Sequence, residues 1–164
     1  MAGYSNQKVF ILYEDEHLLV VKKPFGMESQ RGKSFAMDQE SLLRGYLSSK
    51  TKTDNPYLAV VHRLDRPVAG VMVYAKTKKA AADLSAQLQT ENFSKKYEAV
   101  VSGIVPACEG RLEDYLTADK RTGTTSVSSK ADPLAKKAVL TWKEIAREEV
   151  KSGEILLPYA SNPS

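Results

Sequence analysis

The sequence predicts an α+β domain in which a mixed, largely antiparallel sheet is accompanied by two helices. Short apolar runs rich in branched and aromatic residues recur along the chain, and two segments repeat apolar residues at helical spacing. Most connections between these segments are short. At 164 residues the chain has the usual length of one domain, so we predict a single domain over residues 1–164.

The first half of the chain is predicted to contain four strands. Residues 8–14 and 17–23 are apolar runs separated by acids, which is typical of paired strands, and a Pro-Phe-Gly turn ends the second run. Residues 57–62 and 70–76 are two further runs of strand length. The segment RLDRPVA between them is therefore expected to be a loop that holds Asp65 between two buried strands.

Two helices are predicted from the spacing of apolar residues. The first covers residues 38–48, where Asp38 stands near the start and Gly45 weakens the helix. The second covers residues 77–92, where Thr77 can cap the first turn. The apolar stripe consists of Leu42, Leu43, Tyr46 and Leu47 in the first helix and of Ala81, Leu84 and Leu88 in the second.

The second half of the chain is predicted to consist of strands. Residues 95–103 alternate in polarity and end at a glycine, and three more runs of strand type follow at 110–116, 136–145 and 154–158. The segment 118–133 is polar and rich in turn-forming residues, so we expect a loop there.

Composition and charge limit the class of protein. Hydrophobic residues make up 42% and charged residues 27%, which is close to the average for soluble globular domains and disfavours disordered or fibrous chains. The net charge is +4, and residues 63–79 contain five bases and one acid, which indicates an anionic partner for that region. Since no signal peptide and no apolar run of membrane-spanning length is found, a cytoplasmic location is expected.

Several kinds of site are disfavoured by the sequence. Cys108 is the only cysteine, which excludes an internal disulfide and a multi-cysteine zinc site. His17 and His62 are isolated from other metal ligands, so we expect no metal, and a metal-dependent nuclease is disfavoured. Neither a G-x-S-x-G elbow nor a glycine-rich phosphate loop is present in the sequence.

Asp65 is the strongest candidate for chemistry. Arg63 and Arg66 flank it, and nearby positive charge favours the ionised form of a carboxylate. The alternative is a structural aspartate that pins its own loop through an ion pair with an arginine. Local composition alone favours this alternative. Local composition does not, however, explain why the whole sequence from His62 to Thr77 has the pattern that it has.

That string, HRLDRPVAGVMVYAKT, resembles the catalytic motif of the RluA/RsuA-type RNA pseudouridine synthases. LYEDEHLLVVKKPFGM resembles the opening strand pair of that family, and KKYEAVVSGIVP resembles its second motif. LEDYL, DK and AKKAVLTWKEI are similar to the strands that follow. The resemblance covers roughly residues 8–145 and implies the pseudouridine synthase catalytic-domain fold.

The resemblance implies isomerisation of uridine to pseudouridine in structured RNA, either rRNA or tRNA, without metal or cofactor. Asp65 matches the essential carboxylate, and Tyr97 matches a tyrosine that lies against the flipped uracil and could assist proton transfer. Arg63 matches an arginine that enters the base stack when the target nucleotide leaves. Tyr97 could instead be an ordinary inward strand aromatic, and the lysines could equally form a solvated helix start. The implied RNA-binding residues are Arg63, Arg66, Lys76, Lys78 and Lys79.

Two departures from the family pattern stand out. Lys22 occupies the usual asparagine position before Lys-Pro. The third motif, G-R-x-H-Q-I-R, whose first arginine pairs with the catalytic aspartate, does not occur in the sequence, and neither does an S4-type RNA-binding domain. We therefore expect a catalytic domain truncated before the third motif, acting as a monomer. The alternative is a catalytically inactive RNA-binding derivative of the same family.

Overall fold

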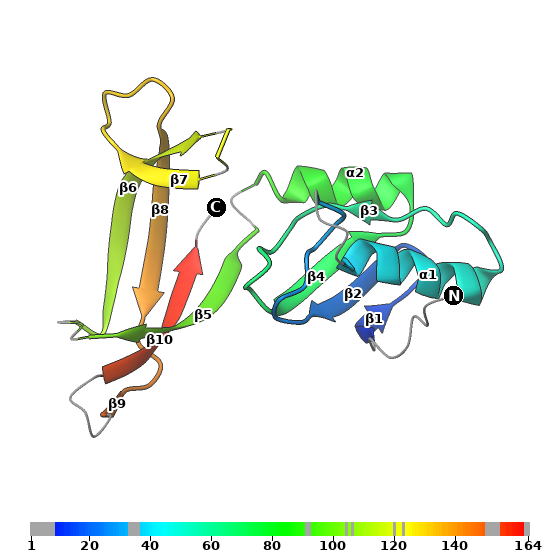
Figure 1. The fold of residues 1–164 in the computed structure, drawn as a ribbon, viewed down its shortest axis with the longest axis horizontal. Helices are drawn as coiled ribbons and strands as arrows, with labels where there is room; N and C mark the ends of the chain where they lie inside the picture. The colour runs from blue at the N-terminus through cyan, green and yellow to red at the C-terminus, as the bar shows by residue number, and fades with distance from the viewer. Residues whose placement is uncertain are drawn as a thin grey trace. The chain divides into compact units, whose positions relative to one another are not determined.

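The computed structural model describes residues 9–32, 37–90, 93–103, 105, 107–119, 121–122, 124–149 and 155–162, with side chains described up to residue 147. The chain divides into two compact units, Met1–Leu88 and Gln89–Ser164, whose elements are labelled in Figure 1. Both helices lie in the first unit, and each unit has an antiparallel sheet. The predicted α+β class with two helices is confirmed, while a single domain stays a prediction.

The sheet of the first unit has the strand order β1-β2-β4-β3. Strand β2 lies between β1 and β4, and its register places Leu19 beside Tyr74 and Val21 beside Met72. These four side chains point to the same face and are fully buried, as the alternation of a strand requires. The strands are β1 (Phe10–Glu14), β2 (Leu18–Lys23), β3 (Ala59–Val60) and β4 (Gly70–Ala75).

Helix α1 (Gln39–Thr51) covers the buried face of this sheet, as Figure 1 shows. Asp38 is its N-cap, because the carboxylate accepts a hydrogen bond from the Ser41 amide at 2.9 Å. Leu43 and Leu47 from the predicted stripe pack into the core with the strand residues. The helix runs past the predicted end at residue 48, and Lys52 ends it in a left-handed conformation with φ of 58°.

Helix α2 (Lys78–Gln87) lies along β4 and β3. The predicted cap is confirmed, since Thr77 Oγ1 accepts a hydrogen bond from the Ala80 amide at 3.2 Å. The helix ends five residues before the predicted boundary at residue 92, which lies outside the described residues. None of its residues is fully buried, so α2 covers the sheet more loosely than α1 does. In the described part of the chain, neither helix is long and apolar enough to cross a membrane.

The sheet of the second unit has the order β5-β10-β8-β6-β7, and β9 pairs with β10. The predicted loop at 118–133 is wrong in part, because β6 extends to Asp119 and β7 lies within this segment. Strand β10 also continues beyond the predicted end at residue 158, and a register shift follows Pro158. The strands are β5 (Lys95–Ser102), β6 (Glu109–Asp119), β7 (Thr124–Ser128), β8 (Lys136–Lys143), β9 (Glu148–Glu149) and β10 (Ile155–Asn162).

Two aspartates explain why a polar segment forms a hairpin. Asp119 accepts hydrogen bonds from the amides of Arg121 and Thr122, which closes the turn between β6 and β7. Asp132 accepts hydrogen bonds from the hydroxyls of Thr117 and Ser128, which holds the turn after β7 against β6. The polar side chains thus stabilise the two turns, while threonine and valine favour the exposed strand between them.

Candidate active site

The loop that carries Asp65 leaves the sheet between β3 and β4. Strand β3 ends at Val60, although the sequence predicted a strand through residue 62. The reason is His62, whose Nε2 accepts a hydrogen bond from the Val73 amide of β4 at 3.0 Å. The imidazole thus takes the place of a backbone carbonyl at the edge of β4, and the backbone is free to turn away from the sheet.

Leu64, the residue before Asp65, anchors the loop to the first unit. Its side chain packs against the core, and a Cβ on Gly70 would come within 3.1 Å of Leu64 Cδ1, so glycine at the start of β4 suits this packing. Its backbone is held by Ser29, whose Oγ donates to the Leu64 carbonyl at 2.5 Å and accepts from the Leu64 amide at 3.0 Å.

Arg66, the residue after Asp65, is anchored to the turn that follows β2. The Gly26 amide donates to the Arg66 carbonyl at 2.9 Å, and Arg66 Nε donates to the Gly26 carbonyl at 3.0 Å. Gly26 has a φ of +79°, a conformation that residues with a side chain rarely adopt. The backbone is therefore held on both sides of Asp65 by the segment 23–29.

A buried lysine lies beneath this loop. Lys23 is 0% exposed, and its Nζ donates to the carbonyls of Met27 at 2.6 Å, Pro24 at 3.3 Å and Arg66 at 3.4 Å. Burial lowers the pKa of Lys23, and the negative charge of Asp65 partly offsets this effect. Lys23 therefore supplies both hydrogen bonds to the loop and a positive charge that interacts with Asp65.

The Asp65 side chain is exposed, and so are Arg63 and Arg66. Within the described ranges, no ion pair joins Asp65 to either arginine. An aspartate with a purely structural role was expected to pin its own loop through an ion pair with Arg63 or Arg66. The described residues do not contain that ion pair. The structure does contain an electrostatic interaction between Asp65 and Lys23.

Lys76 does not resemble the other basic residues of the predicted RNA-binding set. Its Nζ forms an ion pair with Glu14 at 2.8 Å, also donates to the Asp15 carbonyl, and is only 17% exposed at the side chain. Glu14 also accepts from Tyr46 Oη at 2.7 Å and from Lys50 Nζ at 2.9 Å. Burial would raise the pKa of Glu14, but these donors outweigh it and bring the pKa down to about 2.

Within the first unit, two lysines of the predicted RNA-binding set lie at the other end of β4 from the Asp65 loop. Lys78 and Lys79, here called the α2 lysine pair, are exposed in the first turn of α2. They follow the far end of β4, and the six residues of that strand span ~17 Å at about 3.3 Å per residue. Tyr97 lies half-buried on β5 in the second unit and pairs with Ala160 of β10.

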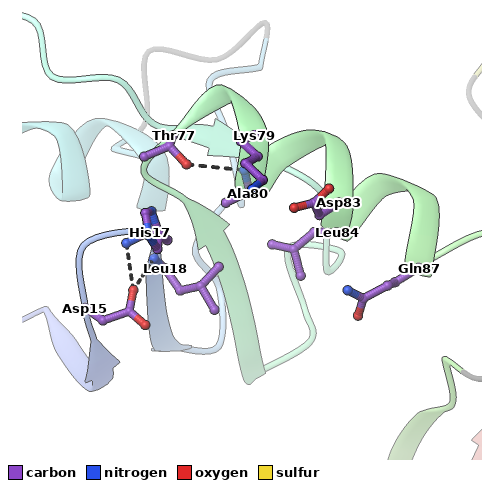
Figure 2. Close-up of a pocket in the computed structure, with 9 residues that line it drawn as sticks. All are labelled: Asp15, His17, Leu18, Thr77, Lys79, Ala80, Asp83, Leu84 and Gln87. Carbon is purple, nitrogen blue, oxygen red and sulfur yellow. Dashed lines mark hydrogen bonds between the residues drawn. The ribbon is translucent and has the colours of Figure 1, made fainter.

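An open pocket of about 350 Å³ lies where α2 meets the turn between β1 and β2 (Figure 2). Asp15 shapes this turn, because its carboxylate accepts from the amides of His17 and Leu18. The pocket adjoins the α2 end of β4, whereas the Asp65 loop precedes the other end. The described residues contain no group of three potential metal ligands. The pocket is lined by Asp15, His17, Leu18, Thr77, Lys79, Ala80, Asp83, Leu84 and Gln87.

Comparison with known proteins shows which family the chain belongs to. The family model described as RNA pseudouridylate synthase matches residues 17–157, which is most of the chain. The chain belongs to this family. The match includes the Asp65 loop, the segment 23–29 that holds it, and Tyr97.

Individual relatives of the family agree with this assignment. The chain is 41% identical over 96 residues to ribosomal large subunit pseudouridine synthase D of Pseudomonas aeruginosa, covering 58% of this chain and 29% of the relative. It is 31% identical over 140 residues to tRNA pseudouridine synthase C of Yersinia pestis, covering 85% of this chain and 52% of the relative. The chain thus spans about half or less of these curated relatives.

A solved structure of a family member has the same fold. Human RNA pseudouridylate synthase domain containing 4 superposes with a TM-score of 0.72 at 21% identity, covering 94% of this chain and 59% of that one. At this identity the likeness concerns the fold. It supports the pseudouridine synthase catalytic-domain fold that the sequence predicted.

Two residues of the site were not predicted from the sequence. Lys23 has a signal that could have revealed it, because it continues the alternation of the buried residues Leu19 and Val21 on β2. A lysine at a buried position of a strand needs partners for its charge. Ser29 has no comparable signal, since its partner Leu64 lies 35 positions away in the sequence.

Proposed function

We propose that this chain isomerises uridine to pseudouridine in structured RNA, with Asp65 as the catalytic carboxylate. The observation that carries the proposal is the Asp65 loop itself: an exposed carboxylate whose two neighbouring residues are held in place and whose charge interacts with buried Lys23. Family membership and the names of the relatives support the reaction.

The reaction requires a group of this kind. The bond between N1 of uracil and C1′ of the ribose breaks, the base turns, and a bond from C5 to C1′ forms, while C5 loses a proton and N1 gains one. Atoms and electrons balance without an oxidant or a metal. An ionised carboxylate can act as the nucleophile or can stabilise developing positive charge. Its exposure suits a target nucleotide that has been extruded from the RNA stack.

We assign supporting roles to two further residues. Tyr97 is proposed to lie against the uracil ring and to assist proton transfer at C5, and its half-buried position leaves part of the side chain accessible. Arg63 is proposed to enter the base stack when the target nucleotide leaves. Its exposed position two residues before Asp65 supports this role.

RNA is proposed to contact two separate parts of the first unit. Arg63 and Arg66 would bind phosphates close to the target nucleotide, and the α2 lysine pair would bind phosphates beyond the other end of β4. We remove Lys76 from the proposed set, because the ion pair with Glu14 already engages its ammonium. The partner is proposed to be rRNA or tRNA, on which the protein acts as a cytoplasmic monomer without metal or cofactor.

Replacing Asp65 by asparagine tests this function. Asp65→Asn keeps the side-chain volume and leaves the anchors at Leu64 and Arg66, so we expect folding and RNA binding to persist and pseudouridine formation to be lost. Mass spectrometry of the treated RNA would measure the product, and Asp54→Asn, at another exposed aspartate, is the matched control.

The possible results separate the candidate functions. Activity of Asp65→Asn within tenfold of the wild type would show that Asp65 is not the essential carboxylate. A wild-type chain that binds RNA but forms no pseudouridine would favour the inactive RNA-binding derivative.

A further inference from the structure

We infer that the Ser29 hydroxyl is a positioning residue for Asp65, fixing the peptide that directly precedes it. The inference rests on the proposed function of Asp65. It is carried by the paired hydrogen bonds that Ser29 Oγ makes with the amide and the carbonyl of Leu64.

In these two hydrogen bonds the serine hydroxyl acts once as a donor and once as an acceptor. A hydroxyl has one proton to donate and lone pairs to accept, and here the proton goes to the Leu64 carbonyl while a lone pair receives the Leu64 amide. Leu64 belongs to no strand, so its backbone groups lack the partners that a sheet would provide. Ser29 is 5% exposed, which limits competition from water for these bonds.

Ser29 is itself held by the core of the first unit. The Tyr74 hydroxyl donates to the Ser29 carbonyl at 3.2 Å, and Tyr74 is fully buried on β4. Burial raises the pKa of Tyr74, with smaller contributions from Glu40 and Asp38, so its hydroxyl remains protonated and able to donate.

The chain on the N-terminal side of Ser29 is also fixed. The Glu28 carbonyl accepts from the Gln39 amide at 2.8 Å, which ties this segment to the first turn of α1. A continuous series of contacts therefore runs from the core through Ser29 and Leu64 to the backbone of Asp65.

The role of the hydroxyl differs from that of the Leu64 side chain. The side chain is anchored in the core and keeps the loop attached without Ser29. The hydroxyl constrains the orientation of the peptide on either side of Leu64, including the peptide that joins Leu64 to Asp65. Its loss should therefore widen the range of positions of the carboxylate while leaving the fold and the RNA-binding surface in place.

The experiment compares three variants of the full chain with the wild type. Ser29→Ala removes the hydroxyl, Ser29→Thr retains it, and Ser41→Ala removes another hydrogen-bonded serine hydroxyl, which binds Asp38 at the start of α1. Amide hydrogen exchange, measured residue by residue by NMR, reports on the Leu64 amide. Steady-state kinetics of pseudouridine formation separate kcat from KM.

For Ser29→Ala we expect exchange at Leu64 to be at least tenfold faster, while the amides between β2 and β4 keep their wild-type rates. We expect kcat to fall at least tenfold with KM within twofold, and Ser29→Thr to recover most of both losses. Ser41→Ala should change neither quantity. A smaller folded fraction would also lower the apparent kcat at unchanged KM, but it would speed exchange at the amides between β2 and β4 as well as at Leu64. Faster exchange at Leu64 alone therefore separates a loss of positioning from a loss of folding.

Either of two results would overturn the inference. The first is an unchanged exchange rate at Leu64 in Ser29→Ala, and the second is a kcat of that variant within twofold of an active wild type. If the wild-type chain forms no pseudouridine, the proposed function fails instead. The exchange rate at Leu64 then decides alone whether Ser29 holds the loop.

Discussion

Replacing Glu14 by glutamine tests the charge cluster that joins β1, α1 and the end of β4. The Glu14 carboxylate is only 10% exposed and accepts hydrogen bonds from Tyr46, Lys50 and Lys76. Glutamine has nearly the same shape, but it carries no charge and presents an amide donor to ammonium groups that need acceptors. Glu14→Gln therefore removes the electrostatic interaction with little change in packing.

The expected magnitude follows from the pKa of Glu14, which is about 2 instead of the ordinary 4.5. Each pKa unit corresponds to about 1.4 kcal/mol, so the ionised side chain stabilises the folded state by about 3 kcal/mol. Because the folded-state pKa is the lower one, this stabilisation is complete above the unfolded-state value of 4.5 and is lost as the pH falls towards 2. At pH 7 we expect Glu14→Gln to be less stable by about this amount.

Urea unfolding between pH 7 and pH 2 is the assay. Both helices belong to the first unit, so circular dichroism at the helical band reports its unfolding, while Trp142, the only tryptophan, reports the second unit by fluorescence. The difference between wild type and Glu14→Gln should shrink towards zero as the pH approaches 2. Glu16→Gln, at an exposed acid in the neighbouring turn, is the matched control. Parallel pH profiles for wild type and Glu14→Gln would refute the reasoning.

Four further predictions concern lysines and glycines. Lys76→Ala should destabilise the first unit by about 2 kcal/mol and leave the salt dependence of RNA binding unchanged, because its ammonium binds Glu14. RNA titrations of a variant with alanines at the α2 lysine pair should instead show a weaker salt dependence. The negative slope of log K against log salt should become less steep by about 2. Gly45→Ala should stabilise α1 by up to about 1 kcal/mol in thermal unfolding, since a Cβ there meets no atom within 4 Å. Gly110→Ala should destabilise the second unit by about 1–3 kcal/mol, measured by Trp142 fluorescence, because its Cβ would lie 2.7 Å from Trp142 Nε1.

Each of these four predictions would be contradicted by a specific result. If Lys76→Ala makes the slope of log K against log salt less steep, Lys76 contacts RNA after all. If alanines at the α2 lysine pair leave this slope unchanged, that pair does not contact RNA. A lower melting temperature for Gly45→Ala would mean that the helix needs glycine there. Wild-type stability of Gly110→Ala would mean that the indole ring moves aside at little cost.

The sequence by itself determined the features that depend on neighbouring residues. The pairing of β1 with β2, the start of α1 near Asp38, the Thr77 cap of α2 and the position of Asp65 in a loop before β4 were all predicted and are confirmed. Alternation along a strand and capping of a helix are short-range effects of the chain, so local patterns reveal them. The hairpin at β7 was missed because its polar residues form an exposed strand and its two turns at once.

Only the tertiary structure decided which partners the polar groups of the site have. Lys76 belongs to the same basic run as the α2 lysine pair, but β1 brings Glu14 to it from 62 positions away. Lys23 and Ser29 hold the Asp65 loop from 43 and 35 positions away, where no local pattern links them. The physical reason is that a buried charge or hydroxyl must find partners wherever the packed chain supplies them. Which partners these are depends on the register of the strands and on the way α1 closes over the sheet.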